Sequence, residues 1–133
     1  MKYSEDYQRM LDLHREAHEE GVDRIKDGEV IPTEGRRVFE GSEILPMLPT
    51  IKELMNDLEL TSLLDFGCGK GNAYYLSFPM DGEMYANAYE YLNIPTASVH
   101  LYDPCVDAFA NKPRQEQTYD VVVCTDVLEH IPE

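Results

Sequence analysis

The chain has 133 residues, 43% of them hydrophobic, which suits one globular domain with its own core. Its formal charge of −15, from 26 acidic and 11 basic residues, makes nucleic acid an unfavourable partner, because phosphates would be repelled. No apolar run approaches the roughly 20 residues of a membrane span. The N-terminus lacks the apolar core of a secretion signal, and three cysteines without a CxxC pair argue against a disulfide framework. We therefore expect a cytoplasmic protein without a membrane partner.

The first predicted element is a helix over residues 4–20. Its apolar positions recur at helical spacing and are Tyr7, Met10, Leu11, His14, Ala17 and His18. Ser4 is the expected N-cap and Gly21 the expected stop. Residues 28–41 carry glycine, proline and charge without periodicity, which predicts a loop.

A second helix is expected to begin after Ser42 as its cap and to run to Leu58. Pro46 and Pro49 should confine the regular part to the residues that follow them, because proline suits only the first turn of a helix.

Three strands are predicted over residues 60–66, 97–102 and 119–124. Residues 121–123 are all valine, and such an apolar run suits a strand buried on both faces, as in a parallel sheet. A helix should begin at residue 72. This order predicts an α/β domain whose ligands lie outside the carboxyl ends of the strands.

The segment after residue 78 has no periodicity that would place it. Its tyrosines and methionines are expected either to cover the core or to line an acceptor pocket. A further helix is expected over residues 126–130.

The first strand runs directly into a turn with Gly67, Gly69 and Gly71. Glycine tolerates positive φ and has no Cβ to hold a ligand away from the backbone, so the turn indicates a nucleotide-like ligand. A phosphate-binding P-loop is excluded, because position 64 is leucine and position 71 is glycine. A dinucleotide fingerprint is disfavoured, because the third glycine comes one residue too early for it.

Three motifs resemble those of the class I S-adenosylmethionine-dependent methyltransferases. Residues 65–71 are similar to the first motif, an acidic residue followed by GxGxG. Residues 99–104 are similar to the second-strand motif, and residues 119–132 to the fourth-strand motif. The resemblance implies a truncated or minimal Rossmann-like core with a mainly parallel sheet over residues 60–133. Residues 1–59 would be an N-terminal helical lead.

The resemblance also implies a site for S-adenosyl-L-methionine, with S-adenosyl-L-homocysteine as the product. The expected cofactor-binding residues lie at the ends of the three strands and are Asp65, Phe66, Gly67, Cys68, Gly69, Gly71, Asp103, Pro104, Cys124, Thr125 and Asp126. The Asp103 carboxylate can accept two hydrogen bonds from the ribose diol; its alternative role is a turn former before Pro104.

The amino acid end of the cofactor is expected at the glycine turn, whose backbone N–H groups would face it. The resemblance implies that Asp65 and the backbone around Cys124 hold the ammonium group. No metal is expected, because the sulfonium already activates the methyl group.

Several side chains have both a chemical and a structural interpretation. Asp126 and His130 are catalytic candidates, whereas Asp126 and Glu129 also fit a capping pair at a helix start, and we favour the structural role for Glu129 and His130. His14 and His18 have a spacing that can bind zinc, but an ordinary helix face is preferred.

The three cysteines follow or end different strands, at positions 68, 105 and 124. They would meet at one sheet edge, where small apolar residues are favoured over a thiol cluster.

Two departures from the family limit the functional expectation. Only sixteen residues, 104–119, separate Asp103 from Asp120, where the family fits a helix and a further strand, and residues 109–117 show no apolar alternation. We therefore expect that strand to be absent or vestigial, so that this loop would have to form the adenine wall. The family normally has further strands after residue 132. If the natural chain ends at Glu133, the strand at 121–123 is a sheet edge, and we expect a shortened fragment or a homodimer that covers it.

The expected function is methyl transfer to a small molecule or a protein. The alternatives are a cofactor-binding module without transferase activity and an enzyme that cleaves the cofactor.

Overall fold

The computed structural model describes residues 4–125 and 127, and its first element is helix α1 (Glu5–Glu20). The Ser4 side chain accepts a hydrogen bond from the Tyr7 N–H, and Gly21 ends the helix with a φ of 92°. Both predicted ends are therefore confirmed. None of the described helices is long and apolar enough to cross a bilayer.

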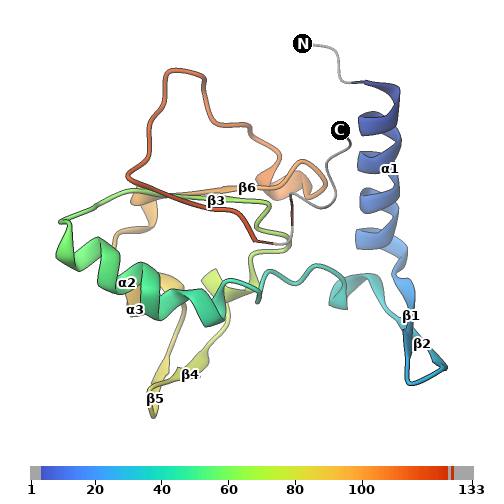
Figure 1. Ribbon diagram of the computed structural model, residues 1–133, viewed down its shortest axis with the longest axis horizontal. Helices are drawn as coiled ribbons and strands as arrows, with labels where there is room; N and C mark the ends of the chain where they lie inside the picture. Colours follow the sequence, from blue (N-terminus) through green and yellow to red (C-terminus); the bar gives the residue numbers. More distant parts are fainter. Residues whose placement is uncertain (1–3, 126, 128–133) are drawn as a thin grey trace.

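Residues 22–33 form an antiparallel hairpin of β1 (Val22–Lys26) and β2 (Glu29–Thr33), which projects from the end of α1 away from the main sheet (Figure 1). The predicted loop over residues 28–41 is therefore wrong in its first part. Asp27 and Gly28 join the strands with φ values of 52° and 82°. Asp-Gly is a preferred pair for such a two-residue turn, because both positions need positive φ.

The hairpin leads through the short helix η1 (Gly35–Arg37) and a connecting segment to η2 (Leu45–Met47) and α2 (Leu48–Asp57). Pro46 and Pro49 lie in the first turns of η2 and α2, as predicted. Ser42 does not cap α2, because a 3-10 turn precedes that helix and Met47 takes the N-cap position.

Three parallel strands form the main sheet in the order β6-β3-β7. They are β3 (Leu63–Phe66), β6 (Val99–Tyr102) and β7 (Val121–Val123). The predicted α/β class with a parallel sheet is confirmed. Parallel pairing aligns the carboxyl ends of all three strands at one edge of the sheet.

The expectation that residues 121–123 are buried on both faces is wrong. Val123 is 7% exposed, but Val122 is 60% exposed. Successive side chains of a strand point to opposite faces, and Val121 and Val123 pack against the core cluster. Figure 1 shows α2 and α3 on the same side of the sheet, which leaves the side of Val122 uncovered by either helix.

The segment after the glycine turn contains short elements rather than one helix. They are η3 (Asn72–Tyr74), the hairpin of β4 (Phe78–Met80) and β5 (Glu83–Tyr85), α3 (Ala88–Leu92) and η4 (Thr96–Ser98). Of the tyrosines and methionines in this segment, Tyr74 and Tyr91 belong to the buried core and Met80, Tyr85 and Tyr89 pack against it, whereas Tyr75 and Met84 are exposed.

The core lies between the sheet and the two helices α2 and α3. Its buried residues are Ile44, Leu48, Ile51, Met55, Leu63, Ala73, Tyr74, Phe78, Ala88, Tyr91, Leu92 and Val123.

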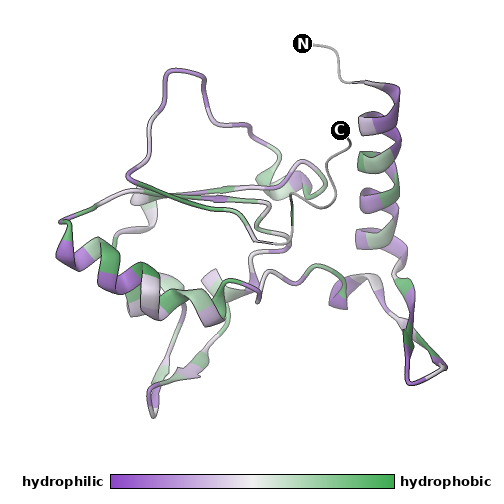
Figure 2. Ribbon diagram, viewed as in Figure 1, coloured by the Kyte–Doolittle hydropathy of each residue, from purple (hydrophilic) through white to green (hydrophobic). Residues whose placement is uncertain are grey.

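The connection from β6 to β7 contains the short helix η5 (Asp107–Phe109) and no strand, as expected. Its far part is predominantly hydrophilic and stands away from the sheet (Figure 2). The predicted helix over residues 126–130 lies outside the described residues apart from Val127.

Candidate functional site

The carboxyl edge of the sheet brings together the turn after β3, the residues after β6 and those after β7. The carbonyl of Tyr102, the last residue of β6, accepts hydrogen bonds from the N–H groups of Gly67 at 2.7 Å and Cys68 at 3.1 Å. The glycine turn is therefore fixed against the neighbouring strand, and Asp103 follows directly at the same edge.

All three glycines of the turn have positive φ: 82° at Gly67, 57° at Gly69 and 66° at Gly71. The expected backbone conformation is confirmed, but neighbouring protein groups occupy much of the space that a Cβ would need. A Cβ at Gly69 would lie 2.4 Å from the Phe39 carbonyl, and one at Gly67 would meet the Val127 side chain at 2.1 Å. Glycine is thus required here for close packing of the chain as well as for φ.

The backbone N–H groups of the turn are all used within the protein. The N–H groups of residues 67 and 68 bind Tyr102, that of Gly69 binds the Asp103 carboxylate, and that of Gly71 binds the Cys68 carbonyl. Lys70 and Asn72 donate to the carbonyls of Phe39 and Glu40 at 2.8 and 2.9 Å. In this structure the turn presents no unused N–H group for the amino acid end of a cofactor.

The Asp103 carboxylate has the turn-forming contacts that the sequence offered as one of its two roles. Its Oδ2 accepts from the Gly69 N–H at 3.0 Å, and its Oδ1 accepts from the Cys105 N–H at 2.9 Å. The second bond is that of a turn former. Each carboxylate oxygen has more than one lone pair, so the group can still accept from a diol.

In the part of the chain that the structure describes, Asp65 is the one charged residue that is buried, with 2% exposure. Its Oδ2 accepts from the Tyr74 hydroxyl at 2.9 Å, and its Oδ1 has no hydrogen-bond partner among the described residues. Burial raises the pKa of Asp65 to about 6, against the lowering effect of the Tyr74 hydrogen bond, and the nearby Asp103 adds to the rise. Burial likewise raises the pKa of Tyr74.

A cavity of about 360 Å³ lies between α1 and this edge of the sheet. Its walls come from segments that are far apart in the chain and are formed by Tyr7, Met10, Leu11, His14, His18, Arg24, Phe39, Glu43, Phe66, Gly67, Gly69, Asp103, Pro104, Cys105, Thr125 and Val127. The volume lies near the lower limit for small-molecule sites.

Six of the predicted cofactor-binding residues line this cavity: Phe66, Gly67, Gly69, Asp103, Pro104 and Thr125. Four others, Asp65, Cys68, Gly71 and Cys124, are described but are not among its wall residues. Asp126 and His130 lie outside the described residues, so their catalytic roles stay predictions.

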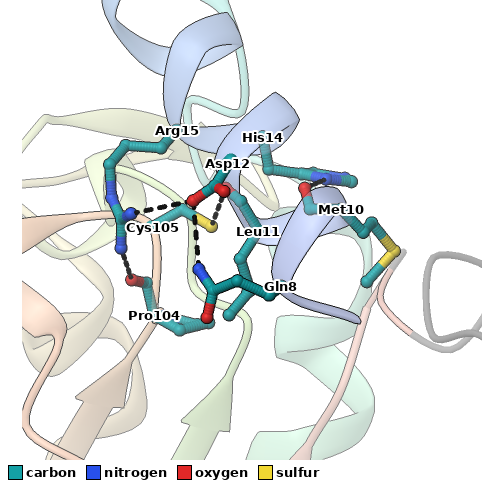
Figure 3. A network of polar contacts seen from close by, with 8 residues as sticks. All are labelled: Gln8, Met10, Leu11, Asp12, His14, Arg15, Pro104 and Cys105. Atoms are coloured by element: carbon teal, nitrogen blue, oxygen red, sulfur yellow. Dashed lines mark hydrogen bonds and ion pairs between the residues drawn. The ribbon is translucent and has the colours of Figure 1, made fainter. Parts of the chain in front are cut away.

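Helix α1 is attached to the loop after β6 by a polar network (Figure 3). The Arg15 guanidinium donates to the Pro104 carbonyl at 3.3 Å, and the Cys105 thiol donates to the Leu11 carbonyl at 3.5 Å. Arg15 also pairs with Asp12 at 3.6 Å on the same helix. The helix is thereby held as one wall of the cavity.

A second attachment joins α1 to the glycine turn. The Lys70 ammonium donates to His18 Nδ1 at 2.9 Å and to the Val38 carbonyl. The His14 and His18 rings lie 5.4 and 5.0 Å from the Phe39 ring. Burial, followed by the charge of Lys70, lowers the pKa of His18, so its ring is neutral near pH 7 and can accept this bond.

A family model described as a methyltransferase domain matches residues 10–133. The chain belongs to this family. The match begins inside α1, so the methyltransferase domain includes most of the segment that carried no recognisable motif. No curated protein and no solved structure matches the chain significantly.

Most of the wall residues that the methyltransferase motifs did not indicate come from residues 7–43 of the chain. The sequence held a signal for five of them, which belong to the apolar face of the predicted helix: Tyr7, Met10, Leu11, His14 and His18. Such a face must pack against something, but the sequence does not say what. Residues 104–119 were expected to form the adenine wall. Of these residues, only Pro104 and Cys105 are among the described residues that line the cavity.

The metal and thiol alternatives gain no support from the geometry. Among the described residues no group of three histidine, cysteine or acidic side chains could hold a metal ion. Cys68 and Cys105 are buried and Cys124 is exposed. Burial raises the pKa of Cys105 to about 11, so this thiol stays protonated at neutral pH and packs as a small apolar group.

Proposed function

We propose that this chain is an S-adenosyl-L-methionine-dependent methyltransferase with a Rossmann-like core, and that its cofactor binds between α1 and the carboxyl edge of the sheet. One observation carries the proposal. In a member of the methyltransferase-domain family, the turn residues Gly67 and Gly69 line the same cavity as Asp103, the residue expected to bind ribose.

The chemistry of the wall fits such a ligand. Phe66, Pro104 and Leu11 offer apolar surface for an adenine ring, and the Asp103 carboxylate can accept from the ribose hydroxyls. Glu43, also in the wall, carries the charge that suits an ammonium group. The Asp65 oxygen that has no partner among the described residues is a further acceptor, and a nearby cation would offset the cost of its desolvation.

When bound, the cofactor would supply a methyl group on a positively charged sulfur. The protein's own part would then be to hold this group and the acceptor in line and to exclude water, since positioning accounts for much of the acceleration of such a displacement. A base is needed only for an acceptor that must lose a proton. Asp126 and His130 remain the proposed candidates for that role.

We further propose a small molecule or a protein as acceptor and a cytoplasmic location. The charge of −15 supports the exclusion of nucleic acid, because a phosphate-rich acceptor would be repelled.

Calorimetric titration with S-adenosyl-L-methionine and S-adenosyl-L-homocysteine tests the site. Asp103→Ala should lower the affinity for both ligands by about tenfold or more, because hydrogen bonds to a charged acceptor are lost. Asp107→Ala is the matched control, since this exposed acid does not line the cavity. Thermal unfolding of each variant separates lost binding from the lost backbone contacts of Asp103. Folded wild-type protein that binds neither ligand would contradict the cofactor assignment.

Transfer itself is tested with cofactor labelled in the methyl group, incubated with metabolite and protein mixtures. Label in an acceptor supports a methyltransferase. Binding without consumption would indicate a cofactor-binding module, and cofactor breakdown without an acceptor would indicate a cleaving enzyme.

A further inference from the structure

The amino acid end of the cofactor carries a carboxylate as well as an ammonium group. A carboxylate removed from water needs N–H donors or a cation, because leaving it unpaired is costly. If the proposed function holds, the carboxylate of the cofactor needs such a partner in the protein.

The glycine turn does not offer that partner. Every backbone N–H from residue 67 to residue 72 already donates to a protein acceptor. Diverting one of them to a ligand would leave a carbonyl or the Asp103 carboxylate without its donor. The carboxylate must therefore be held by another group.

Few basic side chains near the cavity could hold the cofactor carboxylate. The Lys70 ammonium is bound to His18 and the Val38 carbonyl, and Lys70 is not a wall residue. His18 has its pKa lowered by burial and accepts a bond from Lys70. Arg24 is the one lysine or arginine among the described wall residues.

The Arg24 guanidinium has no hydrogen bond or ion pair with any described residue. In contrast, Arg15 and Arg36 are paired with Asp12 and Glu34. Other exposed arginines, such as Arg37, also lack an ion pair with a described residue, and Arg24 differs from them by its place in the cavity wall. Its planar fork is suited to binding a carboxylate through two parallel hydrogen bonds.

The hairpin that carries Arg24 is anchored at its base. A Cβ at Gly21 would lie 2.0 Å from the Thr33 carbonyl, and one at Gly35 would lie 2.4 Å from the Glu19 carbonyl. The two ends of the hairpin are thus packed closely against each other and against the end of α1. Arg24 lies opposite Ile31, near this anchored base, which limits how far it can move from the cavity.

We propose that Arg24 binds the carboxylate of the cofactor's amino acid end, so that the exposed hairpin is part of the cofactor site. The hairpin, which no motif marked, would then have a direct role in distinguishing the full cofactor from analogues without the carboxylate.

The test is a binding cycle with two ligands, S-adenosyl-L-methionine and its decarboxylated form. Arg24→Gln should weaken binding of the first by about tenfold to a hundredfold, because charge-assisted hydrogen bonds are lost. It should change binding of the decarboxylated ligand by less than about twofold. Arg24→Lys, which keeps the charge but not the fork, should fall between wild type and Arg24→Gln.

Arg37→Gln is the matched control, because this exposed arginine follows the hairpin and does not line the cavity. Equal loss for both ligands, or unchanged affinity for S-adenosyl-L-methionine, would overturn the role of Arg24. If wild-type protein binds neither ligand, the proposed function itself fails. If Arg24→Gln slows only transfer to an anionic acceptor, Arg24 contacts the acceptor and the inference is wrong.

Discussion

Asp65 shows how a single buried acid can lower the stability of a fold. Its carboxyl is 2% exposed and one of its oxygens has no partner among the described residues. Burial disfavours its charged form, which is why its pKa rises from 3.8 to about 6. The motif indicated an acidic residue at this position, but only the packing of Tyr74 and the sheet around it determines how strongly the acid is desolvated.

The raised pKa of Asp65 predicts a pH-dependent stability. Between about pH 4 and pH 6 the folded state holds a proton that the unfolded state has lost, so the free energy of unfolding falls as the pH rises through this window. The shift of about two pH units corresponds to about 3 kcal/mol. Asp65→Asn, which keeps an acceptor for Tyr74, should gain stability relative to wild type by up to that amount between pH 4 and pH 6.5 in urea unfolding.

Asp120→Asn is the control, because the contribution of Asp120 to the free energy of unfolding changes with pH in the opposite direction. Asp120 accepts hydrogen bonds from the Thr61 and Ser62 N–H groups at 2.8 and 3.1 Å, and these lower its pKa. Its contribution is present above the unfolded pKa and is lost in acid. A difference between Asp65→Asn and wild type that does not vary with pH would contradict the assignment for Asp65.

At the scale of elements, two Asp-Gly pairs decide the structure of segments that lacked periodicity. Asp27-Gly28 and Asp81-Gly82 both have positive φ at each position, and each joins two antiparallel strands. Asp-Gly is a preferred pair for a two-residue hairpin turn, so both hairpins could have been predicted from sequence. The placement of α1 could not, because its contacts are made with residues far away in the chain.

The Lys70 attachment of α1 gives a prediction for that element. Lys70→Met removes the bonds to His18 and the Val38 carbonyl, so α1 should open more often and its backbone amides should exchange faster. Exchange of residues 5–20, measured by mass spectrometry, should rise severalfold while that of β3 is unchanged. Lys112→Met, in the exposed loop, should leave both unchanged.

His18 makes the same attachment dependent on pH. Its pKa is lowered below 6.5, so the folded state takes up a proton only in more acidic solution than the unfolded state does. Stability from this group is therefore lost as the pH falls below 6.5. Protonated His18 can no longer accept from Lys70, and faster exchange of α1 should accompany acidification. Exchange of α1 that is independent of both the Lys70 substitution and the pH would contradict this attachment.

For the whole molecule, the edge strand β7 is the surface through which we expect copies of the chain to associate. Among the described residues β7 has one sheet neighbour, and Val122 is 60% exposed. We propose that the unpaired edge allows self-association in the 133-residue chain, because exposed strand edges are templates for further pairing.

Analytical sedimentation tests whether the chain self-associates through the β7 edge. Val122→Lys should shift the chain toward monomer, since a charge on an exposed edge opposes pairing. Val30→Lys in the β1–β2 hairpin is the matched control, because Val30 is 61% exposed on another strand. A wild-type chain that is monomeric at all concentrations would remove the proposed homodimer.

The sequence by itself determined the local features of this protein: the ends of α1, the proline positions around α2, the three strands and the glycine turn with positive φ. These depend on capping, fixed φ and side-chain alternation, which act over a few residues. Only the tertiary structure decided that α1 and Arg24 line the cavity. It also decided that the N–H groups of the glycine turn donate to acceptors within the protein. These features arise from contacts between distant segments, and local sequence patterns carry no record of such partners.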